Sequence, residues 1–237
     1  MCITSAQYTR AVISSGLIDN HVESHTRPLC LTPDFNDQYY IDQLDRIRTE
    51  NPALYQRMST PRPLYKSASV GDLQTFFVNI DDGSGGSEEV ELTAELIAKG
   101  QYNAIWADPS EIGTAITLAE GQVYLKALEE NSPEASRDPT KGIYDLLLQY
   151  FGSPPNKDGD GIVDYLFADL PSGIAGYFSP LDQSDQIGSN KRDMLYVDIN
   201  MSQNYTLSTI AHEMQHLVHS NYTNKGAKFN EGLSEMA

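Results

Sequence analysis

The stretch Thr209–Ser220, TIAHEMQHLVHS, decides the fold prediction because it contains the pattern H-E-x-x-H. An α-helix advances about 100° per residue, so His212 and His216 lie one turn apart on the same face. Two imidazoles placed in this way can bind one metal ion. Glu213 lies beside them, where its carboxylate can take a proton from a metal-bound water. The stretch therefore predicts a zinc-binding helix with Glu213 as its general base.

The same helix carries an apolar stripe that we expect to lie in a core. Its members are Leu207, Ile210, Ala211, Met214, Leu217 and Val218. A buried side and a metal-binding side are thus compatible in one helix. The three-residue pattern is short, however, and also occurs by chance on ordinary amphipathic helices. A second motif is needed to decide between the two interpretations.

That second motif is N-E-G-L-S-E, residues 230–235. Catalytic zinc takes three protein ligands and keeps a fourth position open, and Glu231 can be the third ligand, after Asn230 as a helix N-cap. Glu235 lies one turn later and faces the same way. We expect its carboxylate to accept a hydrogen bond from the outer ring nitrogen of His212 and so to fix the tautomer of that ring.

The region before these motifs suggests two further segments. Residues 1–62 are polar, with one helix expected over 37–58 that Pro52 interrupts. Short β-prone runs separated by turn residues then predict strands over 73–80, 90–97 and 102–108. We expect a small β domain over 63–108, acting as an accessory domain or a pro-segment.

Residues 109–237 have a mixed pattern of expected helices and strands and contain both motifs. Helices are expected over 116–131 and 140–151, where apolar residues recur at helical spacing. Strands are expected over 162–170 and 194–200, joined by a glycine-rich link containing GYFSP. The predicted fold class is α+β, with the small β domain before these elements and the H-E-x-x-H helix after them.

The strand MLYVDIN comes shortly before the metal helix and could bind substrate. If it lies at the edge of the sheet, an extended peptide can pair with the backbone of Leu195, Tyr196 and Val197. The alternative, a strand inside the sheet, fits the same residues.

The segment NKDGDGIVD predicts a calcium site. Asn156, Asp158, Asp160 and Asp164 occupy positions 1, 3, 5 and 9 of a calcium loop, with a glycine at position 6. Position 12 is Phe167, where an EF-hand has a bidentate glutamate. Ordinary turn chemistry before a strand explains the same residues, so both interpretations stay open.

Composition limits the partners and the location of the chain. With 33 acidic and 16 basic side chains, a net charge of −17 disfavours nucleic acid and anionic membranes. No apolar run is long enough to span a bilayer. Cys2 and Cys30 form one disulfide or remain two free thiols. We expect a secreted or cell-surface protein whose signal peptide is absent from this sequence; its oligomeric state is left undetermined.

The motifs AHEMQH and FNEGLSEMA resemble the gluzincin metallopeptidases, and most of all the hyicolysin family of bacterial secreted proteases. The similarity extends through GDGIVDYLFADL, GYFSPLD and SNKRDMLYVDIN, so it covers about residues 110–237. The resemblance implies that residues 109–237 form a zincin-like catalytic lobe, a mixed sheet with a backing helix and the H-E-x-x-H helix. This lobe would hydrolyse proteins or peptides, with Zn²⁺ held by His212, His216 and Glu231. Members continue into a helical second lobe, so we expect a form truncated after the helix of Glu231.

Two other functions fit part of the sequence. One is a Ca²⁺-stabilised surface or adhesion module in which the H-E-x-x-H helix is catalytically silent. The other is a zinc aminopeptidase, which needs a site for the free amine of its substrate. The favoured prediction is a zinc-dependent endopeptidase in which Glu213 activates water.

Overall fold

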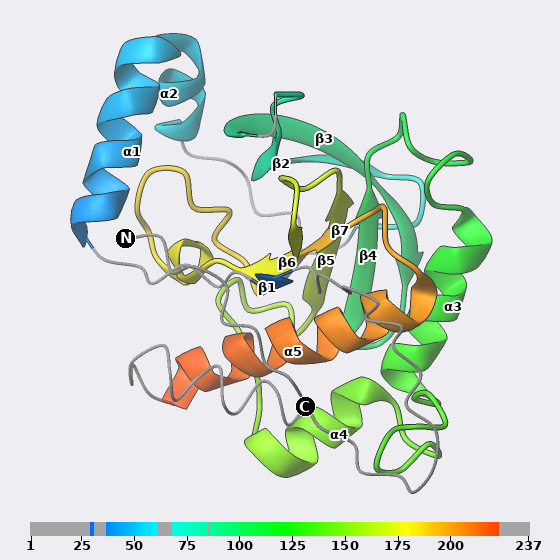
Figure 1. The fold of residues 1–237 in the computed structure, drawn as a ribbon. Coiled ribbons are helices and arrows are strands. Elements are labelled where there is room, and N and C mark those ends of the chain that lie inside the picture. Colours follow the sequence, from blue (N-terminus) through cyan, green and yellow to red (C-terminus); the bar gives the residue numbers. More distant parts are fainter. Residues whose placement is uncertain (1–28, 31–36, 61–67, 85, 223–237) are drawn as a thin grey trace, which may run out of the picture.

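A mixed β-sheet flanked by helices forms the centre of the computed structural model, which describes residues 29–30, 37–60, 68–84 and 86–222 (Figure 1). Its seven strands lie in the order β1-β6-β7-β5-β4-β3-β2. The strands are β1 Leu29–Cys30, β2 Leu73–Asp81, β3 Ser87–Lys99, β4 Asn103–Ala107, β5 Val163–Ala168, β6 Ile174–Phe178 and β7 Met194–Asp198. The helices are α1 Asp37–Glu50, α2 Pro52–Met58, α3 Leu118–Glu129, α4 Ile143–Phe151 and α5 Gln203–Tyr222, with a 3₁₀ turn η1 at Pro180–Gln183. The predicted α+β class is confirmed, and the arrangement is consistent with a zincin-like lobe.

The predicted interruption of the first helix at Pro52 is confirmed. Asn51 separates α1 from α2, and its side-chain oxygen accepts a hydrogen bond from Leu54 N at 3.1 Å. Proline is tolerated at the start of α2 because the first helical N–H has no partner within the helix. Leu54 and Met58 of α2 pack on Phe77 of β2, which attaches this helical pair to the sheet.

The strands predicted as a separate small β domain instead continue the main sheet. β2 and β3 form an antiparallel hairpin, β3 pairs with β4, and β4 pairs in parallel with β5. Phe76 of β2 also packs edge to face on Trp106 of β4, with ring centroids 5.2 Å apart. The division expected at residue 108 therefore runs through one continuous sheet. The predicted boundary is wrong because β4 pairs in parallel with β5, and this pairing joins residues on both sides of residue 108.

Helices α3, α4 and α5 gather on one side of the sheet (Figure 1). Their apolar residues form one core with the inward side chains of β4, β5 and β7. The six residues predicted as the apolar stripe of α5 are all buried. Its histidine side is buried too, since His212, Glu213 and His216 are 9%, 0% and 0% exposed. The metal-binding side of this helix is thus covered by protein.

Strand β7 lies inside the sheet, so the prediction that Leu195, Tyr196 and Val197 form a substrate-binding edge is wrong. β7 pairs in parallel with β5 on one side and antiparallel with β6 on the other, which leaves no backbone groups for a peptide. The sequence GYFSP, expected to be a link, contains the end of β6. This strand was missed because it is short and contains a glycine.

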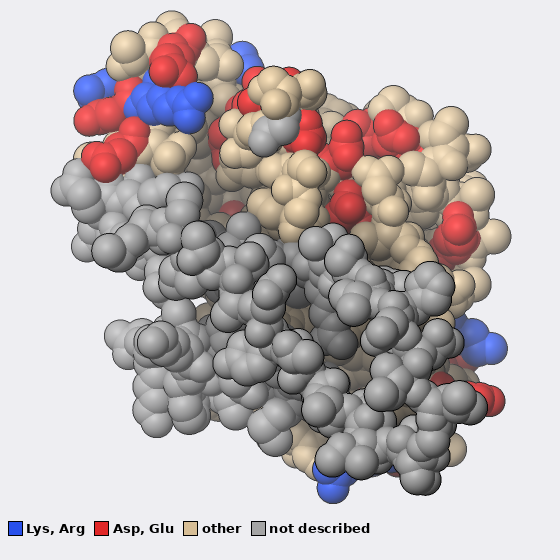
Figure 2. All heavy atoms as spheres, viewed as in Figure 1, with Lys and Arg blue, Asp and Glu red and all other residues tan. Residues whose placement is uncertain are grey.

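Acidic side chains are scattered over the described part of the face in Figure 2 rather than gathered in one patch. Among the described residues, no helix is long and apolar enough to cross a membrane.

Candidate metal centre

The two histidines of α5 lie close enough to share one ion. His212 Nε2 and His216 Nε2 are 3.1 Å apart, and the two rings stand nearly perpendicular at 76°. With Glu213 they form the only group of three potential metal ligands found within the described ranges, and one donor atom from each lies within 4.8 Å of the others. The helical spacing in the sequence predicted this convergence.

Glu213 is held in place by β6, not by its own helix alone. Its Oε2 accepts a hydrogen bond from the backbone N–H of Phe178 at 3.0 Å, and the carboxylate is fully buried. The backbone of an antiparallel strand therefore fixes the orientation of the predicted general base. Sequence reasoning did not identify Phe178, because a backbone amide leaves no residue-specific signal.

Gly176 allows α5 to approach β6 this closely. A Cβ atom at this position would lie 2.7 Å from Thr209 Cγ2, 2.8 Å from Tyr196 O and 3.5 Å from Glu213 Cγ. The first two distances are shorter than any normal contact, so a side chain would push the helix away from the strand. The glycine in GYFSP was the signal in the sequence that could have located this contact.

The donor set fits zinc. Two imidazole nitrogens and a carboxylate are ligand types that Zn²⁺ accepts, and a buried pair of neighbouring Nε2 atoms is costly to maintain without a shared proton or cation. Glu231 and Glu235, predicted as the third ligand and as the partner of His212, lie outside the described residues. Their roles therefore stay predictions.

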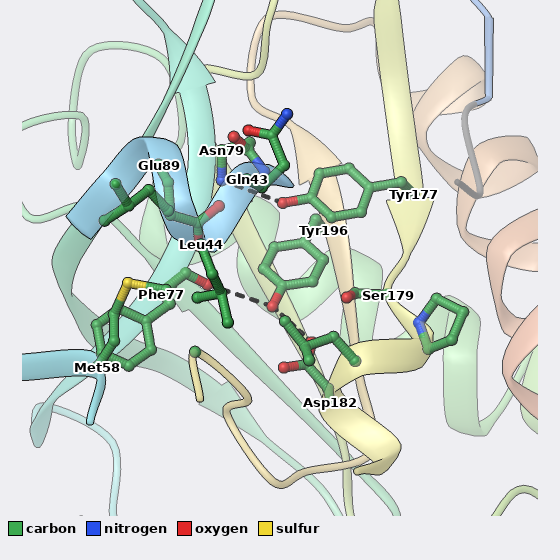
Figure 3. A pocket seen from close by; sticks show the side chains of 14 residues that line it. Gln43, Leu44, Met58, Phe77, Asn79, Glu89, Tyr177, Ser179, Asp182 and Tyr196 are labelled. Atoms are coloured by element: carbon green, nitrogen blue, oxygen red, sulfur yellow. Dashed lines mark hydrogen bonds between the residues drawn. The ribbon is translucent and has the colours of Figure 1, made fainter. Parts of the chain in front are cut away.

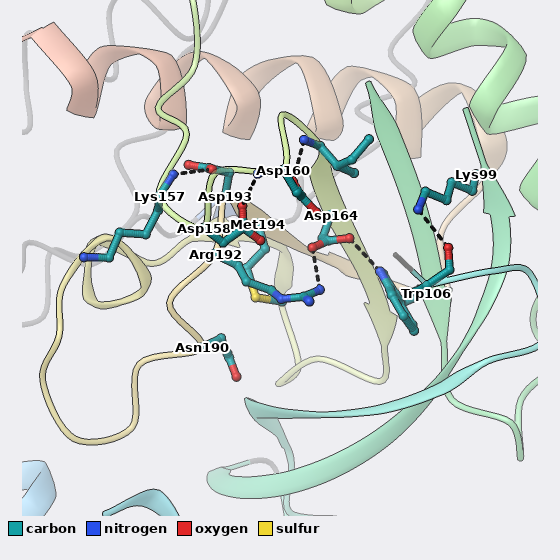
Figure 4. A network of polar contacts seen from close by, with 12 residues as sticks. Lys99, Trp106, Lys157, Asp158, Asp160, Asp164, Asn190, Arg192, Asp193 and Met194 are labelled. Atoms are coloured by element: carbon teal, nitrogen blue, oxygen red, sulfur yellow. Dashed lines mark hydrogen bonds and ion pairs between the residues drawn. The ribbon is translucent and has the colours of Figure 1, made fainter. Parts of the chain in front are cut away.

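The predicted calcium loop folds mainly as a turn (Figure 4). Asn156 Oδ1 accepts a hydrogen bond from Gly161 N at 3.0 Å, and Asp160 Oδ1 accepts one from Ile162 N at 2.7 Å. Asp158 is buried beside Asp160. Burial is the larger cause that raises the pKa of Asp158, and repulsion from the Asp160 carboxylate is the second. Calcium binding by Asn156, Asp158 and Asp160 stays a prediction.

Asp164 has a different role from the predicted one. Its Oδ1 accepts a hydrogen bond from Trp106 Nε1 at 2.7 Å, and its Oδ2 is 2.8 Å from Arg192 Nη1. One oxygen is held by the indole and the other by a buried ion pair, so the prediction of Asp164 as a calcium ligand is wrong (Figure 4). Burial raises the pKa of Asp164 to about 6, while the Arg192 charge opposes that rise.

A second feature is a cavity of about 130 Å³ between α1, α2 and the sheet (Figure 3). Tyr177 and Tyr196 stack in its wall with ring centroids 4.2 Å apart, and Tyr196 OH donates to Asp182 Oδ2 at 2.7 Å. Burial raises the pKa of Asp182 to about 7. Burial, and then the charge of Asp182, raises the pKa of Glu89 to about 8. The cavity therefore favours neutral carboxyl groups.

Comparison with known proteins supports a metalloprotease relationship. The neutral metalloprotease ShpI of Staphylococcus hyicus is 35% identical over 92 residues, an alignment that covers 32% of this chain and 21% of the relative. The chain thus matches about a fifth of that protein's length. No family model matches the chain. The cluster of His212, Glu213 and His216 is consistent with this relationship and offers a donor set suited to zinc.

Proposed function

We propose that this chain is a gluzincin-type zinc metalloendopeptidase that hydrolyses proteins or peptides. The observation that carries the proposal is the burial of Glu213 beside two converging imidazoles, with its carboxylate held by Phe178 N. A carboxylate oriented in this way can receive a proton at a fixed point next to the metal position. The partial similarity to ShpI supports the same reaction class.

Zinc, when bound, acidifies water and polarises the scissile carbonyl. The residues of the chain supply the rest. His212 and His216 provide two ligands from one helix, and Glu231 is proposed as the third. Glu213 accepts a proton from the attacking water and returns it to the leaving amine, so no covalent enzyme intermediate is needed.

The proposal is tested by comparing zinc content and peptidase activity in matched variants. Glu213→Gln keeps the shape of the side chain and one hydrogen bond acceptor for Phe178 N. We expect it to retain zinc while activity on casein falls by about 10² to 10⁴-fold, the usual contribution of a general base. Glu134→Gln, a change at an exposed glutamate, serves as control and should leave both unchanged.

The third ligand and the metal itself need separate measurements. We expect Glu231→Gln to lower the zinc content and 1,10-phenanthroline to abolish activity until zinc is added back. If the wild-type chain binds zinc with full occupancy and cleaves neither casein nor short peptides with free or blocked amino termini, the peptidase proposal is wrong. Selective cleavage of peptides with free amino termini would instead support an aminopeptidase.

A further inference from the structure

The cavity between α1, α2 and the sheet lies on the opposite face of the sheet from α5. Tyr177 of β6 and Tyr196 of β7 line it and share an apolar cluster with Trp106. The next residue of β6, Phe178, and the preceding residue of β7, Leu195, belong instead to the core formed with α5. No residue of α5 lines the cavity. A molecule bound there would therefore not contact the metal-binding residues of that helix.

Two carboxyl groups line this cavity, and none of the described residues in its wall is Lys, Arg or His. Glu89 comes from β3 and Asp182 from η1 (Figure 3). Asp182 is 1% exposed, and its two oxygens accept hydrogen bonds from Tyr196 OH and Asn190 N, each at 2.7 Å. No hydrogen bond or ion pair from the described residues engages the Glu89 carboxylate. An acceptor without a donor thus lies in the wall beside a second, buried carboxyl group.

Much of the remaining wall is apolar. Leu44 and Ile47, one turn apart on α1, line it together with Met58, Phe77 and Leu181. The volume of the cavity is about 130 Å³. An apolar cavity of about 150 Å³ can hold benzene, so this one is large enough for a molecule of about five non-hydrogen atoms. Apolar surface next to two carboxyl groups suits a short alkyl chain with a cationic end.

We propose that this cavity binds a primary alkylammonium group, whose head donates to the carboxylates of Glu89 and Asp182 while its alkyl chain packs against Leu44 and Phe77. A primary ammonium carries three donors on a compact head, and Glu89 has acceptor positions that no described residue uses. Burial of a cation is costly unless an opposite charge pairs with it, and these two carboxyl groups can supply that charge. A divalent metal ion fits less well, because it needs oxygen ligands where this wall is apolar.

Proton linkage gives the expected pH dependence of binding. Burial raises the pKa of Asp182 to about 7, and burial with the charge of Asp182 raises the pKa of Glu89 to about 8. The other titratable groups of the wall are the phenols of Tyr177 and Tyr196, whose pKa values burial raises further. The lining residues of α1, α2 and β2 carry no charge. An alkylammonium stays charged below about pH 10 and favours ionised carboxyl groups, so its affinity should rise from about pH 6 to 8, by up to about tenfold per unit for each proton released.

NMR titration of the full chain with n-butylammonium chloride tests the proposal. Salt at about 0.15 M screens the acidic surface, where amines bind without saturation. The backbone amide signals of Asn79 and Glu89 should shift and saturate between about 0.1 and 10 mM, the range open to so small a ligand. Butan-1-ol and butyrate have the same chain length and lack the cation, so each should bind at least about tenfold more weakly. No saturation by about 20 mM, or equal binding of butan-1-ol, would overturn the proposal.

Two pairs of variants locate the binding site. Glu89→Gln should weaken butylammonium binding about tenfold or more, whereas Glu88→Gln, at the exposed neighbour, should not change it. Leu44→Phe should abolish binding by filling the cavity, while Ile41→Phe, at a residue 48% exposed on the same helix, should leave binding intact. Unchanged affinity in both Glu89→Gln and Leu44→Phe would show that the amine binds elsewhere.

The source of the ammonium group is tested by a second probe, N-acetyl-lysine methylamide, which presents it on a peptide backbone. Saturable binding of this probe assigns the cavity to lysine side chains, and binding of butylammonium alone assigns it to free amines.

The inference does not rest on the proposed function, and the outcomes keep the two apart. Butylammonium should bind equally well to the EDTA-treated chain and to Glu213→Gln. A chain that binds the amine and cleaves no peptide supports the cavity assignment and contradicts the peptidase proposal. An active peptidase without saturable binding of either amine supports the peptidase and overturns the cavity assignment.

Discussion

Replacing Asp164 with Asn should destabilise the protein strongly and to the same extent with or without calcium. Asp164 and Arg192 have side chains 5% and 3% exposed and form an ion pair at 2.8 Å. Asn keeps an acceptor for Trp106 Nε1, which now binds Asp164 Oδ1. The variant therefore removes the negative charge while leaving the local shape and that hydrogen bond in place.

The magnitude follows from the burial of Arg192. Unit charges about 4 Å apart attract by about 4 kcal/mol at an effective dielectric constant of about 20. Removing one partner of a buried ion pair typically costs about 3 to 5 kcal/mol, because the other charge stays desolvated. We therefore expect Asp164→Asn to lower the free energy of unfolding by about 3 to 5 kcal/mol. Asp164→Asn/Arg192→Met, which removes both charges, should recover much of that loss.

Urea unfolding followed by circular dichroism measures these differences. Fluorescence is less suitable, because the single tryptophan of the chain, Trp106, is itself bonded to Asp164. Each protein should be measured in excess EGTA and in millimolar calcium. A loss below about 1 kcal/mol in EGTA would refute the reasoning. So would a loss seen only in calcium, since Asp164 would then act as a cation ligand.

Three further variants test other contacts. Gly176→Ala should cost about 1 to 3 kcal/mol by overpacking and reduce peptidase activity, because the added methyl group would meet Thr209 and Tyr196 O; unchanged urea unfolding and activity would contradict this close approach. As pH rises from about 5 to 8, Glu89→Gln should become more stable relative to wild type, by less than about 1.4 kcal/mol per pH unit. The control Glu88→Gln, at an exposed glutamate, should show no such change. Parallel stability–pH profiles for Glu89→Gln and wild type would contradict the prediction. Thr117→Ala removes the capping box with Glu120 and should cost about 1 kcal/mol, whereas Thr117→Ser should cost little; equal melting temperatures would contradict the cap.

The sign of the Glu89 prediction follows from proton linkage. The folded-state pKa of Glu89 is raised to about 8, so the folded protein holds a proton that the unfolded chain has already released above about pH 5. Rising pH therefore favours unfolding in the wild type until the folded state also ionises. Glutamine cannot titrate and lacks this dependence. Glu89 is only partly buried, so solvent reduces the slope below its full value.

Local patterns in the sequence predicted most of the elements but not their neighbours. The strands over 73–80, 90–97 and 102–108 are present, as are the helices on both sides of Pro52. The separate β domain was wrong because β4 pairs with β5, whose residues lie more than fifty positions away in the sequence. Turn residues and periodicity report only local preference, and strand order depends on contacts that no local pattern contains.

The candidate site shows the same division between local and distant information. His212 and His216 converge because one helix sets their spacing, so the sequence alone was enough to pair them. Asp164 was assigned to a loop by position counting, and its real partner, Arg192, lies on another segment of the chain. Asp164 therefore differs in role from the nearby aspartates of the loop because its partner, Arg192, comes from a distant part of the sequence.

Strand β6 fixes the orientation of Glu213, the proposed general base. The strand supplies the amide of Phe178 that holds Glu213, and it lies between β1 and β7 in the sheet. A displacement of β6 would move the backbone amide of Phe178 and so change the position of the Glu213 carboxylate. The orientation of Glu213 should thus depend on the pairing that keeps β6 in the sheet.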